Sequence, residues 1–401
     1  MAELAGRWEA AALAGRLEAV ADRLEADAPL WRAQPFKELA VPWTEDAPAL
    51  ATALLALDDA SLEALETDPE ALRERLATVD DRFRAVRELV ALPVLPARTL
   101  PDPGPFADRH VPGRKWAQLR AFAAALPETG ARLVDWCAGK GHLGRLLAGA
   151  GAEVRCIEHE AALCAAGRAL AGARPLRFEH RDVLDPTLPL GPDEHVVALH
   201  ACGVLHERLL ERARRERFAV SVAPCCYHHL ADPGAAWAPM SRTGPATGLS
   251  RDDLRLAVAG VATAPRHVRR LRERERLYRA AFDLLQRAVS GEDRYRPVRS
   301  VPGSVLSAGF GAFSAFAADH LGLSLPSGMD LEAWLLRGAA REHRVRRLDL
   351  VRLAYGRLLE LRVVLDRALA LAEAGHRVTL GVFCPRTVTP RNLLLHATPS
   401  P

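Results

Sequence analysis

The sequence predicts an α/β protein built on a doubly wound, mostly parallel sheet. From about residue 115 onwards, short apolar segments alternate with helical segments and short turns, which is the pattern of such a sheet. The first apolar segment also runs into a glycine turn that opens a helix, as in folds that bind nucleotide cofactors. We therefore expect residues 115–401 to form the sheet domain.

The region before this domain has helical periodicity. Leu13, Leu17 and Leu24 fall on one helical stripe, and similar stripes recur up to the first prolines. Residues 1–95 are therefore expected to form a helical N-terminal lobe. The prolines of residues 96–114 predict an irregular linker, either a plain connection or a loop that gates a substrate.

The expected parallel strands are five short apolar runs: 131–136, 153–157, 176–178, 195–199 and 218–223. A helix over 204–215 separates the last two of them. Near the C-terminus, a helix over 362–374 precedes two strands, 376–383 and 392–396, which predict an antiparallel hairpin at the edge of the sheet. The stretch 230–360 is too long for one crossover, so we expect a helical insertion that covers the carboxyl edge of the sheet.

Composition narrows the class of protein. The 401 residues are 49% hydrophobic and 26% charged, which are globular values, and the net charge is only +4. No uncharged apolar run approaches the roughly 18 residues of a membrane span, and the first residues lack the order of a signal peptide. We therefore expect a cytoplasmic protein without membrane contact, whose seven cysteines are reduced.

The most informative segment is the glycine turn after the first parallel strand. Gly139 and Gly141 allow left-handed backbone and close approach of a ligand, although a tight turn without a ligand is the alternative. Glu158 ends the second strand, where an acid suits ribose hydroxyls, and Asp182 follows the third, where an acid suits an adenine amino group. Asp135, before the turn, would repel a phosphate and attract a cation. This electrostatic pattern favours S-adenosylmethionine over NAD.

Thiols and imidazoles follow the fourth and fifth strands and are expected to meet in one crevice. One interpretation makes the cysteines small buried hydrophobic residues. A metal site is not expected, because no CxxC pair is present and the adjacent Cys225 and Cys226 form a poor chelating pair. The third interpretation is a wall around the methyl acceptor, in which Tyr227 stacks on a base or orients an amine and His228 takes a proton.

Three motifs together resemble a known family. They are Asp135-Trp-Cys-Ala-Gly-Lys-Gly-His-Leu, Leu199-His-Ala-Cys-Gly and Pro224-Cys-Cys-Tyr-His, which resemble the methyltransferase domain of the methyltransferase-like 25 proteins and their bacterial relatives. Leu365-Asp366-Arg367 and Pro390-Arg391-Asn392 are similar to the C-terminal signature of that group. A more distant resemblance is to the tRNA 2′-O-methyltransferase of the acceptor stem, whose N-terminal zinc-binding segment this sequence lacks.

The resemblance covers about residues 108–398 and implies a class I, Rossmann-like, S-adenosylmethionine-dependent methyltransferase. Cys137 departs from the pattern, since many class I enzymes have their first glycine there. The cofactor-binding residues so expected are Asp135, Cys137, Ala138, Gly139, Lys140, Gly141, Leu143, Glu158, Asp182, Val183, His200, Ala201, Cys202 and Gly203. The residues expected to face the acceptor, as catalytic residues, are Cys225, Cys226, Tyr227 and His228.

The expected reaction is methyl transfer to oxygen or nitrogen, with RNA as the preferred acceptor. Arginines that share one face of a helix could contact phosphates, although a salt-bridged, solvated face is the alternative. These arginines are Arg269, Arg272, Arg276 and Arg279. Two other functions stay open: RNA cytosine-C5 methylation through Cys225 and Cys202, and a non-catalytic binding module with the same fold.

Overall fold

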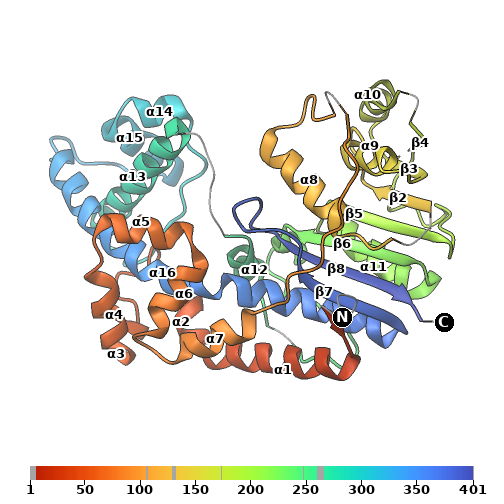
Figure 1. Ribbon diagram of the computed structural model, residues 1–401. Coiled ribbons are helices and arrows are strands. Elements are labelled where there is room, and N and C mark those ends of the chain that lie inside the picture. Colours follow the sequence, from red (N-terminus) through yellow and green to blue (C-terminus); the bar gives the residue numbers. More distant parts are fainter. Residues whose placement is uncertain are drawn as a thin grey trace. The chain divides into compact units, whose positions relative to one another are not determined.

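The computed structural model describes residues 6–104, 107–128, 132–172, 174–246, 248–259 and 266–400 (Figure 1). Contacts between residues divide the chain into two compact units. Unit 1 consists of Met1–Glu25, Glu88–Ala259 and Gly356–Pro401, and unit 2 consists of Ala26–Arg87 and Gly260–Tyr355.

These units differ from the boundaries expected at 1–95 and 230–360. The start of the chain belongs to unit 1, because the Leu380 amide donates to the Gly6 carbonyl at 2.8 Å and the next two residues join the sheet. The other N-terminal helices share unit 2 with most of the insertion, and there the Tyr355 hydroxyl donates to the Asp27 carboxylate at 2.8 Å. Periodicity identifies helices, but it does not identify the helices that pack together.

Within the described residues, unit 1 contains an eight-stranded sheet in the order β1-β7-β8-β6-β5-β2-β3-β4. The strands are β1 (Arg7–Trp8), β2 (Arg132–Trp136), β3 (Val154–Glu158), β4 (Leu176–His180), β5 (Glu194–Cys202), β6 (Ala219–Cys225), β7 (His376–Val382) and β8 (Leu393–Pro399). The run from β6 to β4 is parallel, and β8 is antiparallel to both β6 and β7. The expected parallel strands and C-terminal hairpin are therefore present, but β1 occupies the edge beyond β7, to which it is antiparallel.

The order of the strands reverses between β2 and β5, which are neighbours in the sheet. From β2 the chain moves outwards to β3 and β4 and then returns to β5 and β6. Open α/β sheets bind ligands at the carboxyl ends of the strands beside such a switch point. The segments after β2 and β5 therefore lie where a ligand site is expected.

The helices that pack on the strands of unit 1 present apolar faces to them. They are α8 (Gly113–Ala125), α9 (His142–Gly149), α10 (Ala161–Ala171) and α11 (Val204–Glu216). Unit 1 also contains α1 (Ala10–Ala26), except for its last residue, and α12 (Arg251–Val258). Helix α9 contacts β2, β3 and β4, and α11 contacts β5 and β6. Leu143 and Leu147 of α9 join Phe122, Phe178 and Phe383 in one buried core, which fixes the turn that precedes α9.

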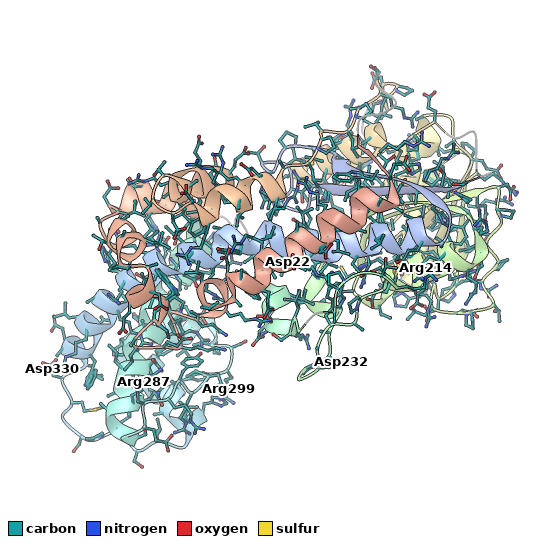
Figure 2. All side chains as sticks on the ribbon, turned by 90° about the horizontal axis from the view of Figure 1, so that it is seen from below. Asp22, Arg214, Asp232, Arg287, Arg299 and Asp330 are labelled. Atoms are coloured by element: carbon teal, nitrogen blue, oxygen red, sulfur yellow. The ribbon has the colours of Figure 1, made fainter. Side chains whose placement is uncertain are left out.

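The helix expected over 362–374 is the end of a single helix, α16 (Leu331–Glu373). In its unit 1 part the buried Asp366 accepts hydrogen bonds from the Met240 amide at 2.8 Å and the Ser241 hydroxyl at 2.6 Å. Arg214 of α11, labelled in Figure 2, donates to the Met240 carbonyl at 3.1 Å. The segment after β6 is thus tied to two helices of unit 1, whereas the sequence placed it in the insertion.

A buried polar chain crosses three neighbouring strands of the sheet. His195 of β5 bonds to the Ser221 hydroxyl of β6 at 2.8 Å, and that hydroxyl bonds to His396 of β8 at 2.8 Å. Burial lowers the pKa of His195 to about 3 and that of His396 to about 4. Both imidazoles are therefore neutral at neutral pH, and the shared hydroxyl donates to one ring and accepts from the other.

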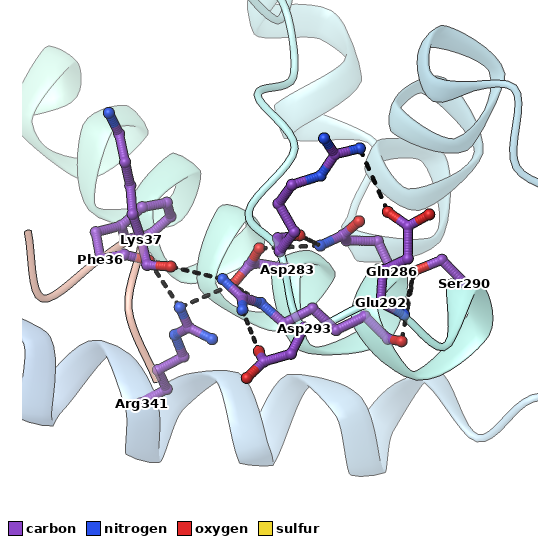
Figure 3. A network of polar contacts seen from close by, with 10 residues as sticks. Phe36, Lys37, Asp283, Gln286, Ser290, Glu292, Asp293 and Arg341 are labelled. Carbon is purple, nitrogen blue, oxygen red and sulfur yellow. Dashed lines mark hydrogen bonds and ion pairs between the residues drawn. The ribbon is translucent and has the colours of Figure 1, made fainter. Parts of the chain in front are cut away.

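Unit 2 is helical throughout its described elements. They are α2 (Ala28–Arg32), α3 (Trp43–Asp46), α4 (Pro48–Leu55), α5 (Asp59–Thr67), α6 (Pro69–Ala77), most of α7 (Arg82–Val90), α13 (Arg266–Ser290), α14 (Gly303–Ser307), α15 (Phe310–Leu321) and the first part of α16. The buried Asp283 binds the guanidinium groups of Arg287 at 3.0 Å and Arg341 at 2.7 Å (Figure 3). These arginines also donate to the carbonyls of Lys37 and Phe36, each at 2.7 Å. The network therefore joins N-terminal and insertion segments.

Among the helices of the described residues, none combines the length and the apolar character that a membrane crossing requires.

Candidate functional site

The turn between β2 and α9 has an unusual backbone. Cys137, Gly139 and Gly141 all have left-handed φ angles, of 58°, 57° and 64°. A Cβ atom at Gly141 would lie 2.4 Å from Cζ of Phe178, so this position requires glycine for space as well as for conformation. At Gly139 a Cβ atom would meet no heavy atom within 4 Å. The protein therefore leaves open space beside Gly139, which is what close approach of a ligand needs.

Glu158 lies under this turn. Its carboxylate accepts hydrogen bonds from the amides of Gly139 at 2.8 Å and Glu160 at 3.0 Å, and the side chain is buried. Nδ1 of His159 lies 3.0 Å from the same carboxylate. A carboxylate has about four lone-pair sites, and the two amides use two of them, so Glu158 keeps acceptor capacity for a ligand.

Asp135 supports the turn from inside the protein. Its side chain is buried, and its carboxylate accepts a hydrogen bond from the Gly144 amide of α9 at 3.0 Å. Burial raises its pKa to about 7, so the charge expected to attract a cation is only partly present at neutral pH. Asp135 therefore attracts a cationic ligand less strongly than the sequence suggested. The hydrogen-bond partner of its carboxylate is the Gly144 amide of α9.

The remaining residues expected around the cofactor take different places. The Ala138 amide donates to the Ile157 carbonyl at 3.0 Å, which ties the turn to β3, and Leu143 points into the core.

Lys140 is exposed. Asp182 is also exposed and accepts from the Leu184 amide at 2.9 Å, while Val183 between them is buried.

The carboxyl end of β5 is irregular. A register shift between Leu199 and Cys202 interrupts its pairing with β6, and His200 there has a left-handed φ of 75°. The His200 ring bonds to the buried Gln118 of α8 at 3.2 Å. Beyond the fully buried Ala201, a Cβ atom at Gly203 would lie 2.7 Å from the Cβ of His229. Gly203 therefore lets the segment after β6 pack against the end of β5.

Three thiols meet where β5 and β6 end. Sγ of Cys202 lies 3.3 Å from Sγ of Cys225 and 3.2 Å from Sγ of Cys226. The adjacent Cys225 and Cys226 were expected to form a poor chelating pair, but Cys226 has a left-handed φ of 51°, and this turn brings both thiols to Cys202. The hydrogen bond with Cys225 is the main cause that lowers the pKa of Cys202 to about 6, while the same bond and burial raise that of Cys225.

Cys137 is the first residue after the neighbouring strand β2 and is half-buried. Burial, and then the negative charges of Glu158 and Asp135, raise its pKa to about 12. Its thiol is therefore protonated at neutral pH. This fits a packing residue of the turn and does not fit a nucleophile.

Tyr227 and His228 lie in a short 3₁₀ helix, η2 (Tyr227–His229), directly after β6. The sequence suggested that Tyr227 stacks on a base or orients an amine. In the structure its side chain is fully buried and its hydroxyl donates to Glu360 of α16 at 3.0 Å, so it does neither. His228 is half-buried, and its buried Nδ1 has no hydrogen-bond partner among the described residues. Burial is the main cause that lowers its pKa, so it is neutral and can accept a proton.

Two buried partners of the site escaped sequence reasoning. Gln118 orients His200, and Glu360, which Arg357 binds at 2.5 Å, holds Tyr227. The signal for Glu360 was a lone acid in residues 358–365, which are otherwise apolar except for Arg362. Such an acid in a buried helix needs a polar partner.

The four arginines expected to bind RNA lie on α13 of unit 2. Arg276 binds Glu342 at 3.3 Å, and Arg279 binds Glu275 at 2.7 Å and the carbonyl of Val298 at 2.9 Å. Arg269 and Arg272 are exposed. Beside them is a hollow of about 580 Å³, whose lining residues are His267, Arg270, Leu271, Arg274 and Ser307.

One comparison with known proteins bears on this site. Residues 117–233 match the model of a protein family described as a methyltransferase domain. The matched segment begins in α8 and ends just after η2, so it contains the glycine turn, Glu158, the irregular end of β5 and the three thiols. This part of the chain is thus similar to methyltransferase domains.

Proposed function

We propose that the protein is an S-adenosylmethionine-dependent methyltransferase of the class I, Rossmann-like type that transfers the methyl group to an oxygen or nitrogen atom of RNA. The observation that carries the proposal is the turn after β2, with its three left-handed residues and the Glu158 carboxylate beneath it, inside the segment that matches a methyltransferase domain.

The residues around the turn fit this cofactor. The central order β4-β3-β2-β5-β6 is that of doubly wound folds that bind their cofactors at the switch point. Glu158 has acceptor capacity for the two ribose hydroxyls, and the space beside Gly139 permits close approach. S-adenosylmethionine, when bound, supplies an electrophilic methyl group on its sulfonium. Asp182, exposed after β4, is the residue proposed for the adenine amino group.

Residues after β5 and β6 are proposed to hold the acceptor. His228 is the candidate for the proton acceptor, because its Nδ1 lacks a partner among the described residues and burial keeps the ring neutral. A general base contributes about 10²–10⁴ to a rate, and positioning supplies much of the remainder. The thiols of Cys202, Cys225 and Cys226 meet at the same ends of β5 and β6.

RNA as the acceptor rests on the resemblance and on exposed arginines of α13. Arg274, Arg276 and Arg279 have intramolecular partners, so the proposed phosphate contacts are Arg269 and Arg272, together with Arg270 at the hollow. Phosphate contacts of this kind give affinity that falls as salt rises.

The test is transfer of a labelled methyl group from S-adenosylmethionine to total RNA from a strain that lacks the protein, followed by mass spectrometry of the nucleosides. We expect label in an N-methylated or 2′-O-methylated nucleoside, and a large loss of label with His228→Ala. Donor binding without transfer to any RNA would overturn the choice of RNA. Absence of both donor binding and transfer would favour the non-catalytic module.

Cytosine-C5 methylation is the second candidate, because Cys202 and Cys225 lie together at 3.3 Å. That reaction passes through a covalent bond between a cysteine sulfur and C6 of the base. RNA that contains 5-fluorocytidine would trap the bond. A protein–RNA adduct stable in denaturing gels would support this candidate, and its absence alongside methyl transfer would exclude it.

A further inference from the structure

Cys202, Cys225 and Cys226 form a cluster, here called the thiol cluster. Lining a methyl-transfer site does not require three sulfur atoms to converge so closely. The cluster's three ligand atoms lie within 4.8 Å of one another, and two of its sulfur–sulfur distances are only 3.2 and 3.3 Å. Buried cysteines that serve as small hydrophobic residues do not require such convergence. We propose that Cys202, Cys225 and Cys226 bind one zinc ion through their three sulfur atoms.

The backbone explains how adjacent cysteines can share one ion. In an extended strand, neighbouring side chains point to opposite faces. Cys225 is the last residue of β6 and pairs with Cys202 of β5, whereas the left-handed backbone of Cys226 returns its side chain to the same side. A non-glycine residue in this conformation carries backbone strain, and such residues tend to mark functional sites.

The donor set and its dimensions suit zinc. Thiolates select soft or borderline ions, and zinc–sulfur bonds of about 2.3 Å in a tetrahedral site separate the sulfurs by about 3.8 Å. The thiol cluster would therefore open by roughly half an ångström on binding. Each thiol that becomes a ligand gives its proton to solvent, and zinc changes no oxidation state.

The fourth position of the ion has a functional meaning. Within the part of the chain that the structure describes, no fourth His, Cys, Asp or Glu completes the cluster. Structural zinc sites have four protein ligands, whereas catalytic sites have three and keep one position for water or a substrate atom. An acceptor atom in that position would have its pKa lowered by the ion. This last consequence rests on the proposed function, whereas zinc binding itself does not.

The experiment titrates the full-length, chelator-treated and reduced protein with zinc chloride in competition with a chromogenic chelator, in the absence of donor and RNA. We expect one zinc ion per chain. Each of the variants Cys202→Ser, Cys225→Ser and Cys226→Ser should weaken zinc binding by about tenfold or more. Cys137→Ser is the matched control, since Cys137 follows the neighbouring strand β2 and is outside the thiol cluster, so its variant should bind zinc like the wild type.

A second measurement does not depend on the folding of any variant. Cobalt bound to the wild-type protein should give intense thiolate-to-metal charge-transfer absorption, which zinc then removes. The proposal is overturned if wild-type protein with titratable thiols takes up no zinc at micromolar concentrations, or if the three serine variants, folded by circular dichroism, bind zinc like the wild type. Either result would leave donor binding and methyl transfer untouched, because those are measured separately.

Discussion

The carboxylate of Glu158, at the end of β3, accepts a hydrogen bond of 2.8 Å from the backbone amide of Gly139, in the turn after β2. One buried side chain thus fixes the left-handed turn and keeps lone pairs for a ligand. The same turn is anchored on its other side by Asp135, which binds the Gly144 amide of α9 at 3.0 Å. Two acids at the ends of neighbouring strands therefore shape this turn before any ligand arrives.

Replacement of Gly141 by alanine should destabilise unit 1 by roughly 2–4 kcal/mol, from left-handed strain and overpacking. The Phe178 ring cannot move away, because Gly167 also packs closely against it: a Cβ atom at Gly167 would lie only 2.2 Å from the ring's Cζ. Gly149→Ala is the control: it lies exposed at the end of α9 with open space around it, and alanine there should stabilise by up to about 1 kcal/mol. Urea unfolding measures both, and equal effects would contradict the steric account.

Replacement of Asp135 by asparagine should change the pH dependence of stability. Its pKa is raised to about 7 in the folded state against 3.8 ordinarily, so its favourable contribution is complete below about pH 4 and is lost as pH rises through 7. The unfolding free energy of the variant relative to wild type should therefore increase from pH 4 to pH 8, by at most about 4 kcal/mol. A difference that is constant with pH, in urea unfolding across this range, would contradict the burial of the charge.

Replacement of Tyr227 by phenylalanine should act on stability. The variant loses the hydroxyl that donates to Glu360 at 3.0 Å and leaves that acid with Arg357, at a cost of about 1–3 kcal/mol. Donor affinity and methyl-transfer rate of the folded variant should stay close to wild type, because the ring is fully buried. If the rate falls more than about tenfold with stability unchanged, Tyr227 does touch the reacting groups.

The double replacement Arg269→Gln and Arg272→Gln should weaken RNA binding and reduce the slope of log affinity against log salt by about 2. Both side chains are exposed, so unfolding should be unaffected. Arg279→Gln is the matched comparison, because Arg279 binds Glu275 and two carbonyls, and its loss should destabilise unit 2. Filter binding across a salt series checks this, and an unchanged slope would show that α13 does not contact phosphates.

Sequence reasoning recovered the parts of the fold that follow local rules. Alternating apolar segments located β2 to β6 within a few residues, and the two apolar segments near the C-terminus located the β7–β8 hairpin. It could not find β1, because two residues carry no periodicity, nor the pairing of β1 with β7 across the length of the chain. The division into units was missed for the same reason, since it depends on which helices share a core.

The candidate site, too, was predictable only in part from the sequence. Topology brought Glu158, Cys202 and Cys225 to the carboxyl edge of the sheet, as expected. The burial of Asp135 and Tyr227 could not be deduced, because it depends on distant elements that cover them. The left-handed backbone of Cys226, which turns an adjacent pair into converging thiols, leaves no mark on a single sequence.

The most direct test of the account is calorimetric titration of the wild-type protein and of Glu158→Ala with S-adenosylmethionine. We expect micromolar binding to the wild type and a loss of about 2–4 kcal/mol in the variant, since two charge-assisted hydrogen bonds disappear. Circular dichroism of the variant verifies that the fold is intact. No binding to the wild type, or equal affinity in the two folded proteins, would contradict a donor site at the turn between Asp135 and Gly141.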